Sequence, residues 1–330
     1  MHYPEVSIIV PIYNVEKYIE KCSRSLFEQT FQSIEYIFVN DCSPDNSINV
    51  IKEILNDYPN RKEQCIFIEL AKNNGPALAR NIGLKESRGK YIYFCDADDW
   101  TNIQLIEKLY NTAICYHSDI VVCDYYMVYN DKKIYSHAEN WASEKINTLR
   151  NYIKKGYNVV WNLFVRSNIY KAYNIRFIEG YTYGEDFNLS VKLLIKSAII
   201  TNLHEPLYYY NQTNATSVTT QMSNRKIYEE QAMCSNLIEW LIKENEYEHY
   251  ADLLNWKILN SKQEWLLNTK DFSKFLEIMP ESNNFILTCP YLNVKLKIMG
   301  WCLVRHLSFI SVTFLFLRHL KQYFINRKKL

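Results

Sequence analysis

The sequence NGPALARNIGLKESRGKYIYFCDADDW, residues 74–100, decides the fold. Gly75 and Pro76 predict the start of a helix, because proline is well tolerated in the first helical turn. The apolar run 91–95 predicts a buried strand, and this strand ends directly in an acidic loop, 96–99. A helix followed by a buried strand with polar residues at its end is typical of an open parallel sheet, which binds ligands at that edge.

The alternation of strands and helices continues on both sides of this stretch. Short apolar runs predict further strands, at 6–10, 34–39, 65–70 and 120–123. Apolar residues at helical spacing, with turn and capping residues nearby, predict helices at 15–26, 48–55 and 101–117. Such alternation implies an α/β fold class, with a mostly parallel sheet and helices on both faces.

The sequence pattern changes twice after residue 123. Mixed, aromatic-rich segments occupy 124–220, and the apolar spacing is largely helical over 227–279. No repeat is visible at the periods typical of solenoids. We therefore expect a first domain over 1–220, a helical region over 221–285 and a tail over 286–330.

The 330 residues have a globular composition, with 48% hydrophobic and 22% charged residues. None of the nine cysteines belongs to a C-x-x-C pair, so neither a zinc site nor a disulfide framework is indicated. Scattered cysteines are typical of free thiols in a reducing compartment. The first residues contain no basic segment before a long apolar run, so no signal peptide is expected and the predicted location is cytoplasmic.

The tail combines positive charge with apolar residues. Eight of the 38 Lys and Arg residues lie in 282–330, and none of the 36 Asp and Glu residues does. This favours an anionic membrane surface over nucleic acid, since nucleic-acid binders carry basic residues across a folded face. The apolar run 307–317 is shorter than the roughly 20 residues of a spanning helix. A peripheral amphipathic helix is expected, and a buried core helix with a basic end is the alternative.

Polar and acidic residues follow three of the predicted strands, at 11–14, 40–43 and 96–99. The sequence contains neither G-x-G-x-x-G nor G-x-x-x-x-G-K-[ST], so glycine-rich phosphate binding is not indicated. A diphosphate at this edge would instead need a divalent cation and basic side chains. Asp96 and Asp98 are the candidate ligands, and an ordinary helix cap is the alternative role of this loop.

Several segments, taken in order, resemble the nucleotide-sugar domain of the inverting family-2 glycosyltransferases, which have the GT-A fold. The resemblance covers roughly residues 4–197 and extends to PLYYY at 206–210. No single segment is decisive, and the ordered set is highly specific. Its members are VSIIVPIYNVEKYIEKCSRSLFEQTF, VNDCSPDNS, NNGPALARNIGLKESRGKYIYFCDADDW and YGEDFNLSVKLL.

The resemblance implies a role for each matching residue. Asp186 is expected to be the general base, and Asp98, with Asp96, the ligand of Mn²⁺ or Mg²⁺. Trp161 and Glu185 are expected at the acceptor pocket, and packing in the core is the alternative for Trp161. The nucleotide-sugar donor is expected to contact Pro11, Tyr13, Asp41, Arg80, Asp96 and Asp98.

Two residues depart from the family pattern after the second predicted strand. The family commonly has an acidic pair there, and this chain has Asn40 before Asp41. The glycine common after that pair is Cys42 in this chain. The ribose or base contact is therefore expected to differ in part, and the loop to be tighter or differently turned.

The resemblance further implies a nucleotide-sugar half over 1–123 and an acceptor half over 124–220. The implied reaction transfers a single sugar from a UDP-sugar to an acceptor hydroxyl by metal-dependent inverting displacement. A lipid-linked glycan in cell-surface polysaccharide synthesis, reached at the cytoplasmic membrane surface, is the expected acceptor. The alternatives are a non-catalytic nucleotide-sugar-binding protein and a nucleotidylyltransferase, although the glycine-rich first turn expected of the latter is missing.

Overall fold

The structure, a computed structural model, describes residues 3–141, 144–155, 159–214 and 224–327, with only the backbone of 154–155, 224, 226 and 318–327. The chain folds as two compact units. The first contains residues 1–152 and 157–222, and the second contains 153–156 and 223–330. The predicted domain limit at 220 lies outside the described residues, next to this division.

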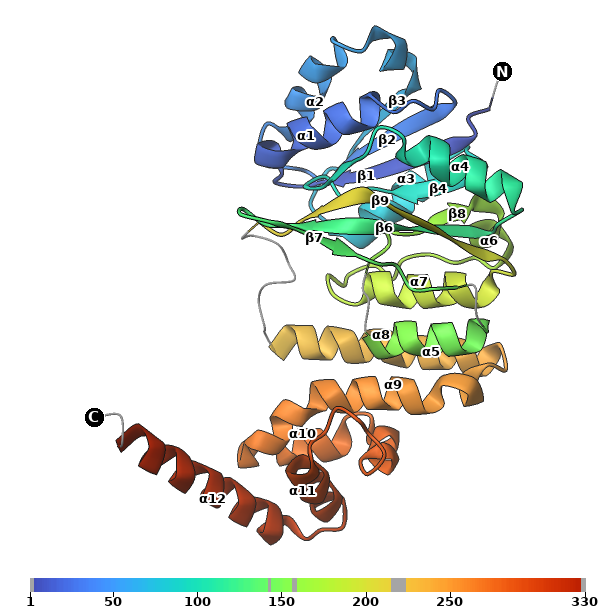
Figure 1. Ribbon diagram of the computed structural model, residues 1–330. Helices are drawn as coiled ribbons and strands as arrows, with labels where there is room; N and C mark the ends of the chain where they lie inside the picture. Colours follow the sequence, from blue (N-terminus) through green and yellow to red (C-terminus); the bar gives the residue numbers. More distant parts are fainter. Residues whose placement is uncertain (1–2, 142–143, 156–158, 215–223, 328–330) are drawn as a thin grey trace. The chain divides into compact units, whose positions relative to one another are not determined.

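Four parallel strands form the first half of the sheet in the first unit (Figure 1). They are β1 (Val6–Ile12), β2 (Ile34–Asn40), β3 (Cys65–Glu69) and β4 (Tyr91–Phe94), in the order β3-β2-β1-β4. They are connected through the helices α1 (Glu16–Phe27), α2 (Ser47–Leu55), η1 (Pro59–Gln64, a 3₁₀ helix) and α3 (Pro76–Glu86). The predicted alternation is confirmed here, and the carboxyl ends of these strands meet at one edge.

The second half of the sheet is mixed. It contains β5 (Trp100–Thr101), β6 (Ile120–Val128), β7 (Lys133–Ser136), β8 (Phe164–Arg166) and β9 (Ile200–Asn211). The order of the whole sheet is β3-β2-β1-β4-β8-β6-β9-β5, with β7 paired to β6. The α/β class is confirmed, but the parallel arrangement is restricted to the first half and to β6 with β9, because β8 runs antiparallel to both β4 and β6.

The helix predicted at 101–117 begins later than expected. α4 spans Leu105–Cys115, and Trp100 and Thr101 instead pair with Tyr209 and Tyr208 of β9. Local spacing does not reveal this pairing, because the partner strand lies far along the chain.

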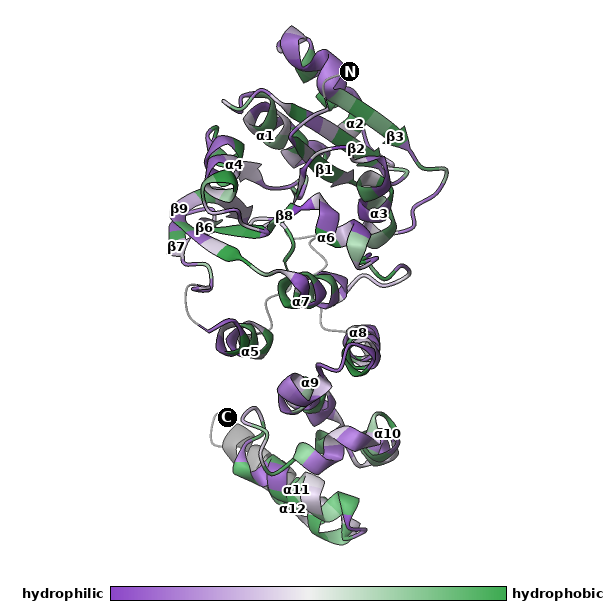
Figure 2. Ribbon diagram, turned by 90° about the vertical axis from the view of Figure 1, so that its right-hand side faces the viewer, coloured by the Kyte–Doolittle hydropathy of each residue, from purple (hydrophilic) through white to green (hydrophobic). Residues whose placement is uncertain are grey.

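Helices cover both faces of the sheet, and the central strands form the hydrophobic layer between them (Figure 2). α1, α2 and α4 pack on one face, where their apolar residues share a buried cluster with Ile8, Tyr36 and Tyr93. α3 packs on the other face so closely that a Cβ atom on Gly83 would lie 2.4 Å from Ile9 Cγ2. The continuous apolar runs of β1 and β2 follow from burial on both faces.

The first unit is completed by α6 (Ser167–Ala172), α7 (Glu185–Lys196) and residues 145–152 of α5 (Lys145–Lys155). Tyr170 of α6 contacts Phe94 of β4 edge to face. α7 is buried from Glu185 to Leu194. Two acids at the start of a buried helix need a cationic partner.

The second unit is helical. It consists of α8 (Asn224–Lys243), α9 (Tyr247–Lys262), α10 (Phe272–Glu277), α11 (Val294–Val304), α12 (Ser308–Arg327) and the 3₁₀ helices Gln263–Leu267, Thr269–Asp271 and Pro280–Phe285. One buried cluster joins Leu259, Phe275, Leu303 and Leu315. This unit therefore does not divide at residue 285, because residues of the predicted tail belong to its core.

The apolar run 307–317 lies mostly in α12, which has two different sides over this length. On one side Leu315 is buried, and the Ser311 hydroxyl donates to the Met299 carbonyl of α11 (2.9 Å). On the other side apolar residues face solvent, namely Phe309, Val312, Phe316 and Leu317. Among the described residues, no helix is both long and apolar enough to cross a membrane. The basic residues Lys328 and Lys329 lie outside the described residues.

Candidate functional site

The loop after β2 holds the loop that precedes α3. The Asp41 carboxylate is buried and accepts hydrogen bonds from the backbone N–H groups of Asn74 (2.9 Å) and Gly75 (2.7 Å). Gly75 has a φ of 88°, a conformation that favours glycine, and α3 begins at the next residue. Asp41 thus fixes the start of the helix that carries Arg80.

Cys42 takes the backbone conformation that glycine would take. Its φ is 55°, in the left-handed region that costs a residue with a Cβ atom roughly 1–2 kcal/mol. The side chain of Asn40 accepts from the Ser43 N–H (2.9 Å) and donates to Glu69, so the turn is closed by local hydrogen bonds. The loop after β2 therefore turns into the left-handed region although the family's glycine is missing.

The loops after β1 and β2 are in direct contact. The Asn14 N–H donates to Ser43 Oγ (2.8 Å). Tyr13 is 46% exposed at this edge, and Pro11 is half-buried where it pairs with Val39. The structure thus brings the predicted nucleoside residues Pro11, Tyr13 and Asp41 onto neighbouring strand ends.

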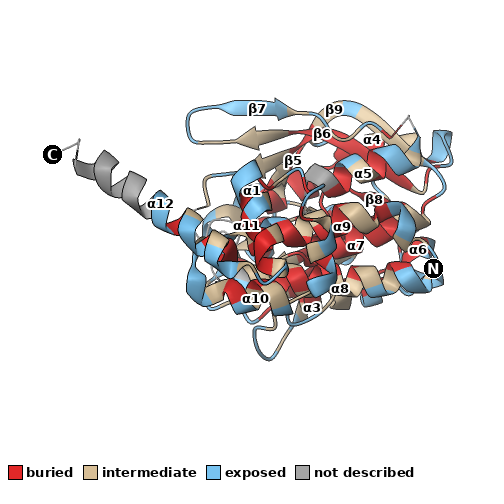
Figure 3. Ribbon diagram, turned by 90° about the horizontal axis from the view of Figure 1, so that it is seen from below, coloured by how far each residue is buried: buried red, intermediate tan, exposed pale blue. Residues whose placement is uncertain are grey.

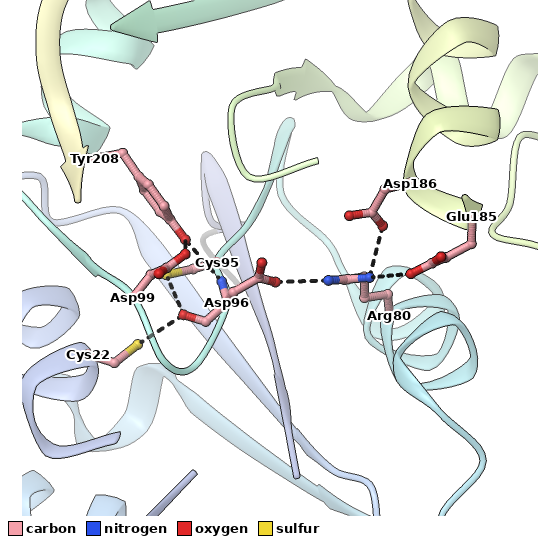
Figure 4. A network of polar contacts seen from close by, with 8 residues as sticks. All are labelled: Cys22, Arg80, Cys95, Asp96, Asp99, Glu185, Asp186 and Tyr208. Atoms are coloured by element: carbon pink, nitrogen blue, oxygen red, sulfur yellow. Dashed lines mark hydrogen bonds and ion pairs between the residues drawn. The ribbon is translucent and has the colours of Figure 1, made fainter. Parts of the chain in front are cut away.

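The acidic loop after β4 is tied down through Asp99. Its carboxylate accepts from the Tyr208 hydroxyl (2.6 Å) and from the Asn211 N–H (2.7 Å), as Figure 4 shows for Tyr208. Asp99 is 1% exposed, and burial, with the charges of Asp98 and Asp96, raises its pKa well above the ordinary value. This acid holds the loop against β9 and is not presented to a ligand.

Asp96 and Asp98 differ from Asp99 because both are only partly buried. Asp98 accepts from the Asn214 side-chain amide (2.8 Å), and Asp96 accepts from Arg80 (2.8 Å). Burial and the charge of Asp96 raise the pKa of Asp98, so negative charge is concentrated in this loop.

These two carboxylates fit a hard divalent cation that is shared with a phosphate ligand. Mg²⁺ typically takes one or two protein carboxylates, with substrate phosphates and water completing its coordination. The described residues contain no group of three or more His, Cys, Asp or Glu side chains suited to a metal. The donor set of Asp96 and Asp98 is therefore appropriate for such a cation, although not for an all-protein cage.

Arg80 of α3 connects the acidic loop with α7 (Figure 4). One guanidinium nitrogen, Nη2, donates to Asp96 Oδ1 (2.8 Å). The other, Nη1, donates to Asp186 Oδ1 (2.9 Å) and lies 3.5 Å from Glu185 Oε1. Arg80 is 5% exposed, and its Nε has no hydrogen-bond partner among the described residues. Burial disfavours its charge, but the carboxylates, Asp186 first, raise the pKa of Arg80.

Asp186 and Glu185 open α7 at the amino end, after Gly184, whose φ is 86°. A helix amino terminus stabilises negative charge, as does the guanidinium of Arg80. Burial nevertheless dominates and raises the pKa of Asp186 well above its ordinary value, with Glu185 and Asp96 adding to the shift. Asp186 is thus a buried carboxylate with raised basicity, which is the property expected of a general base.

Trp161 corrects one of the predictions. It was expected at the acceptor pocket, but it is 1% exposed and stacks on Tyr208 with ring centroids 4.3 Å apart. Its indole therefore belongs to the core, where it supports the tyrosine that holds Asp99. Glu185, the other predicted acceptor residue, lies beside Asp186 and faces Arg80.

The sequence did not single out three residues that shape the site. Tyr208 donates to Asp99 and accepts from the Asp96 N–H (3.3 Å), while Asn211 and Asn214 bond to the main chain and side chain of Asp98. For Tyr208 the alternation in PLYYY was the available signal, since every second residue of a strand points to the same face, and the sequence carried no comparable signal for Asn211 and Asn214.

A hollow of about 670 Å³ lies elsewhere, on α2 and β3, lined by residues such as Asn49, Lys52 and Phe67. It contains none of the residues predicted to bind the donor or the acceptor. The chemistry of the strand ends, rather than the size of a cavity, identifies the candidate site.

Comparison with known proteins shows the family of the chain. The model of the family described as "Glycosyl transferase family 2" matches residues 7–181. The Bacillus subtilis (strain 168) glycosyltransferase EpsJ is 34% identical over 223 residues, which are 66% of this chain and 63% of that protein. The minor teichoic acid biosynthesis protein GgaB of the same organism is 28% identical over 301 residues, which are 86% of this chain and 32% of that protein. The chain thus spans less than two thirds of the length of these two relatives.

A crystal structure of Staphylococcus aureus TarS 1–349 in complex with UDP-GlcNAc shares the fold. It superposes with a TM-score of 0.71 at 20% identity, and the match covers 93% of this chain and 89% of that one. The fold is therefore the GT-A fold with a helical C-terminal region, as the sequence predicted. With the family model matching more than half of its length, the chain belongs to glycosyl transferase family 2.

Proposed function

We propose that this enzyme transfers a single sugar from a UDP-sugar to a hydroxyl of a cell-surface glycan, with inversion and with the help of a divalent cation. The UDP-GlcNAc complex of TarS supports the choice of donor class. GgaB, a protein of teichoic acid biosynthesis by its name, supports a cell-surface glycan as the acceptor.

One observation carries the proposal: the guanidinium of Arg80 bonds to Asp96 of the strand-end loop and to Asp186 of α7. These residues are far apart in the sequence, and each is expected in a different part of the reaction. A donor whose diphosphate lies at Asp96 and Asp98 would therefore present its anomeric carbon toward the start of α7.

Asp186 is the proposed general base. An inverting displacement requires a base that takes the proton of the acceptor hydroxyl while the oxygen attacks the anomeric carbon. The raised basicity of the buried carboxylate suits this task, and the bond to Arg80 orients it. Glu185, which shares the same guanidinium, is proposed to position the acceptor.

Asp98, with Asp96, is proposed to hold Mn²⁺ or Mg²⁺. When bound, such a cation supplies positive charge that neutralises the departing diphosphate. The role of Asp98 is to fix that charge, and Asn214 orients its carboxylate (2.8 Å). Tyr208 and Asn211 keep the loop in place through Asp99.

A lipid-linked acceptor would be reached at the membrane surface, and we propose that α11 and α12 dock the enzyme there. Phe309, Val312 and Phe316 are 66%, 45% and 62% exposed, and their spacing places them on one side of α12. Lys295 and Arg305 are also exposed nearby in the sequence. Apolar side chains with neighbouring basic residues are typical of helices that lie in the membrane interface.

Release of UDP and of pyrophosphate from a panel of UDP-sugars tests the proposal. We expect cation-dependent release of UDP that EDTA abolishes, and no pyrophosphate, which a nucleotidylyltransferase would form or consume. Asp186→Asn should lower turnover by about 100-fold or more while UDP still binds. Asp98→Ala should remove the increase in UDP affinity that the cation causes.

Asp57→Asn is the matched control, because Asp57 also pairs with an arginine but lies on the surface. It should leave both turnover and UDP affinity unchanged. Near-normal turnover of Asp186→Asn would assign the base to another residue, and equal UDP affinity of Asp98→Ala and wild type with the cation present would contradict the cation site.

A further inference from the structure

A second group of residues lies outside the site just described, on the opposite side of β9 from Tyr208. We call it the aromatic ladder and define it as Trp100 of β5, Tyr209 of β9 and Tyr126 of β6. The rings of Trp100 and Tyr209 stack with centroids 5.5 Å apart at 8°, and those of Tyr209 and Tyr126 with centroids 5.5 Å apart at 20°. All three residues are partly exposed.

Two lysines lie over this ladder. Lys21 Nζ of α1 is 3.2 Å from the centroid of the Trp100 ring. Lys133 Nζ of β7 is 5.4 Å from the Tyr126 ring and 5.6 Å from the Tyr209 ring. In the described part of the chain, neither lysine forms an ion pair with an acid.

The two ammonium groups are close enough to repel each other. Burial, and then the charge of Lys133, lowers the pKa of Lys21. Strand β7, which carries Lys133, is mostly exposed and is drawn in pale blue in Figure 3. Two cations held on an aromatic surface, each lacking an acidic partner among the described residues, are complementary to an anionic group placed between them.

We propose that the aromatic ladder, with Lys21 and Lys133, binds a saccharide chain that carries anionic groups. The lysines pair with the carboxylate or phosphate groups of such a chain. The apolar rims of the rings and the tyrosine hydroxyls suit its C–H surfaces and hydroxyls. Nucleic-acid bases fit less well, because they need free ring faces, and these faces are covered by the neighbouring rings and by Lys21.

The position of the ladder relates it to the reaction. Trp100 directly follows the acidic loop 96–99, and Tyr209 is adjacent to Tyr208, which holds that loop. If the chain bound here is the acceptor, a step that rests on the proposed function, the ladder holds it beside the donor site. Binding to the ladder itself does not depend on that step.

Calorimetry with the full chain tests the proposal, with three probes of similar length. A galacturonic acid hexasaccharide carries carboxylates, an oligomer of glycerol phosphate carries phosphodiesters, and maltohexaose is neutral. We expect at least one anionic oligomer to bind more tightly than maltohexaose. Whether the galacturonic acid oligomer or the glycerol phosphate oligomer binds more tightly then shows whether the site prefers carboxylates or phosphodiesters. The double variant Lys21→Gln/Lys133→Gln should lose about tenfold in affinity for that oligomer.

Lys62→Gln/Lys90→Gln is the matched control, because it removes the same charge from two exposed lysines that lie outside the ladder strands and outside α1. Its affinity should change less than twofold, which tests site-specific binding against general charge. The proposal is overturned if both double variants lose affinity equally or if neither anionic oligomer binds better than maltohexaose. UDP affinity, measured on the same samples, separates this failure from failure of the donor site.

Discussion

Arg80 is one residue on which three acidic residues depend. Its guanidinium pairs with Asp96, Glu185 and Asp186 at 2.8, 3.5 and 2.9 Å, and its side chain is 6% exposed. A planar group with donors on two nitrogens can serve two carboxylates at once, which a lysine ammonium cannot do in the same geometry. Arg80 was expected near the donor diphosphate, and its pairs with Asp96 and Asp186 connect the proposed donor site with the proposed base.

Replacement of this arginine tests the link. Arg80→Met should lower the free energy of unfolding of the first unit by about 3–5 kcal/mol near neutral pH, because it removes the cation that pairs with the buried carboxylates. The pKa of Asp186 is raised, so the folded state takes up protons and this acid destabilises the fold more as pH rises through that pKa. Removing Arg80 raises the pKa of Asp186 further. The loss of unfolding free energy caused by Arg80→Met should therefore become smaller as the pH is lowered.

Urea unfolding at neutral and mildly acidic pH measures both effects. Arg24→Met is the control, since Arg24 also bridges two acids, Glu20 and Asp57, but on the surface. Exposed pairs contribute about 0–1 kcal/mol, so this variant should change little at either pH. Equal losses for both variants would mean that the buried network does not stabilise the fold.

At the scale of elements, the sequence predicted what is encoded locally. The helix after Gly75 and Pro76 and the strand before Asp96 were predicted from spacing and turn residues, and both are present. The pairing of Trp100 and Thr101 with β9 was missed, as were the bonds from Tyr208 and Asn211 to Asp99. These contacts join segments that are distant in the sequence, and local propensity and periodicity cannot predict such contacts.

The packing of α3 on β1 was equally hidden from the sequence. Gly83→Ala would place a Cβ atom 2.4 Å from Ile9 Cγ2, so the helix or the strand must move. We expect the unfolding free energy to fall by about 1–3 kcal/mol, although alanine is the better helix former. Denaturant unfolding measures this loss, and a disturbed α3 should also weaken UDP binding, because Arg80 lies one turn earlier.

A double-mutant cycle provides the control for the glycine. Ile9→Ala removes the γ carbons that the new methyl group would meet. The loss of unfolding free energy in the double variant should therefore be clearly smaller than the sum of the losses in the two single variants. Strict additivity would show that the cost of Gly83→Ala arises away from β1. Lys85→Ala, at an exposed position of α3, should be nearly neutral.

At the scale of the whole molecule, the tail combines basic residues with apolar residues that are partly buried and partly exposed. The sequence showed basic residues without acids after 282, and the structure assigns the neighbouring apolar residues to two sides of α12. Leu303 and Leu315 belong to the core of the second unit, so deletion of the tail would disrupt that core. Only substitutions on the exposed side can separate membrane contact from stability.

The triple variant Phe309→Ser/Val312→Ser/Phe316→Ser makes that separation. Burial of an apolar side chain contributes about 1.5–3 kcal/mol when complete, so even partial insertion of three should change vesicle affinity by about tenfold or more. Sedimentation with vesicles that contain phosphatidylglycerol measures the change. The wild-type chain should bind these anionic vesicles more tightly than vesicles of pure phosphatidylcholine. This preference should weaken with salt, because screening acts on the basic residues alone.

The control for this variant removes as many exposed apolar side chains from elsewhere. Ile103, Ile114 and Ile242 are 46%, 38% and 56% exposed, and their replacement by serine should leave vesicle binding unchanged. Thermal unfolding of both triple variants should match wild type, since none of these side chains is buried. If the α12 variant and the control bind vesicles equally, or if wild type does not prefer anionic lipid, the exposed side of α12 does not contact a membrane.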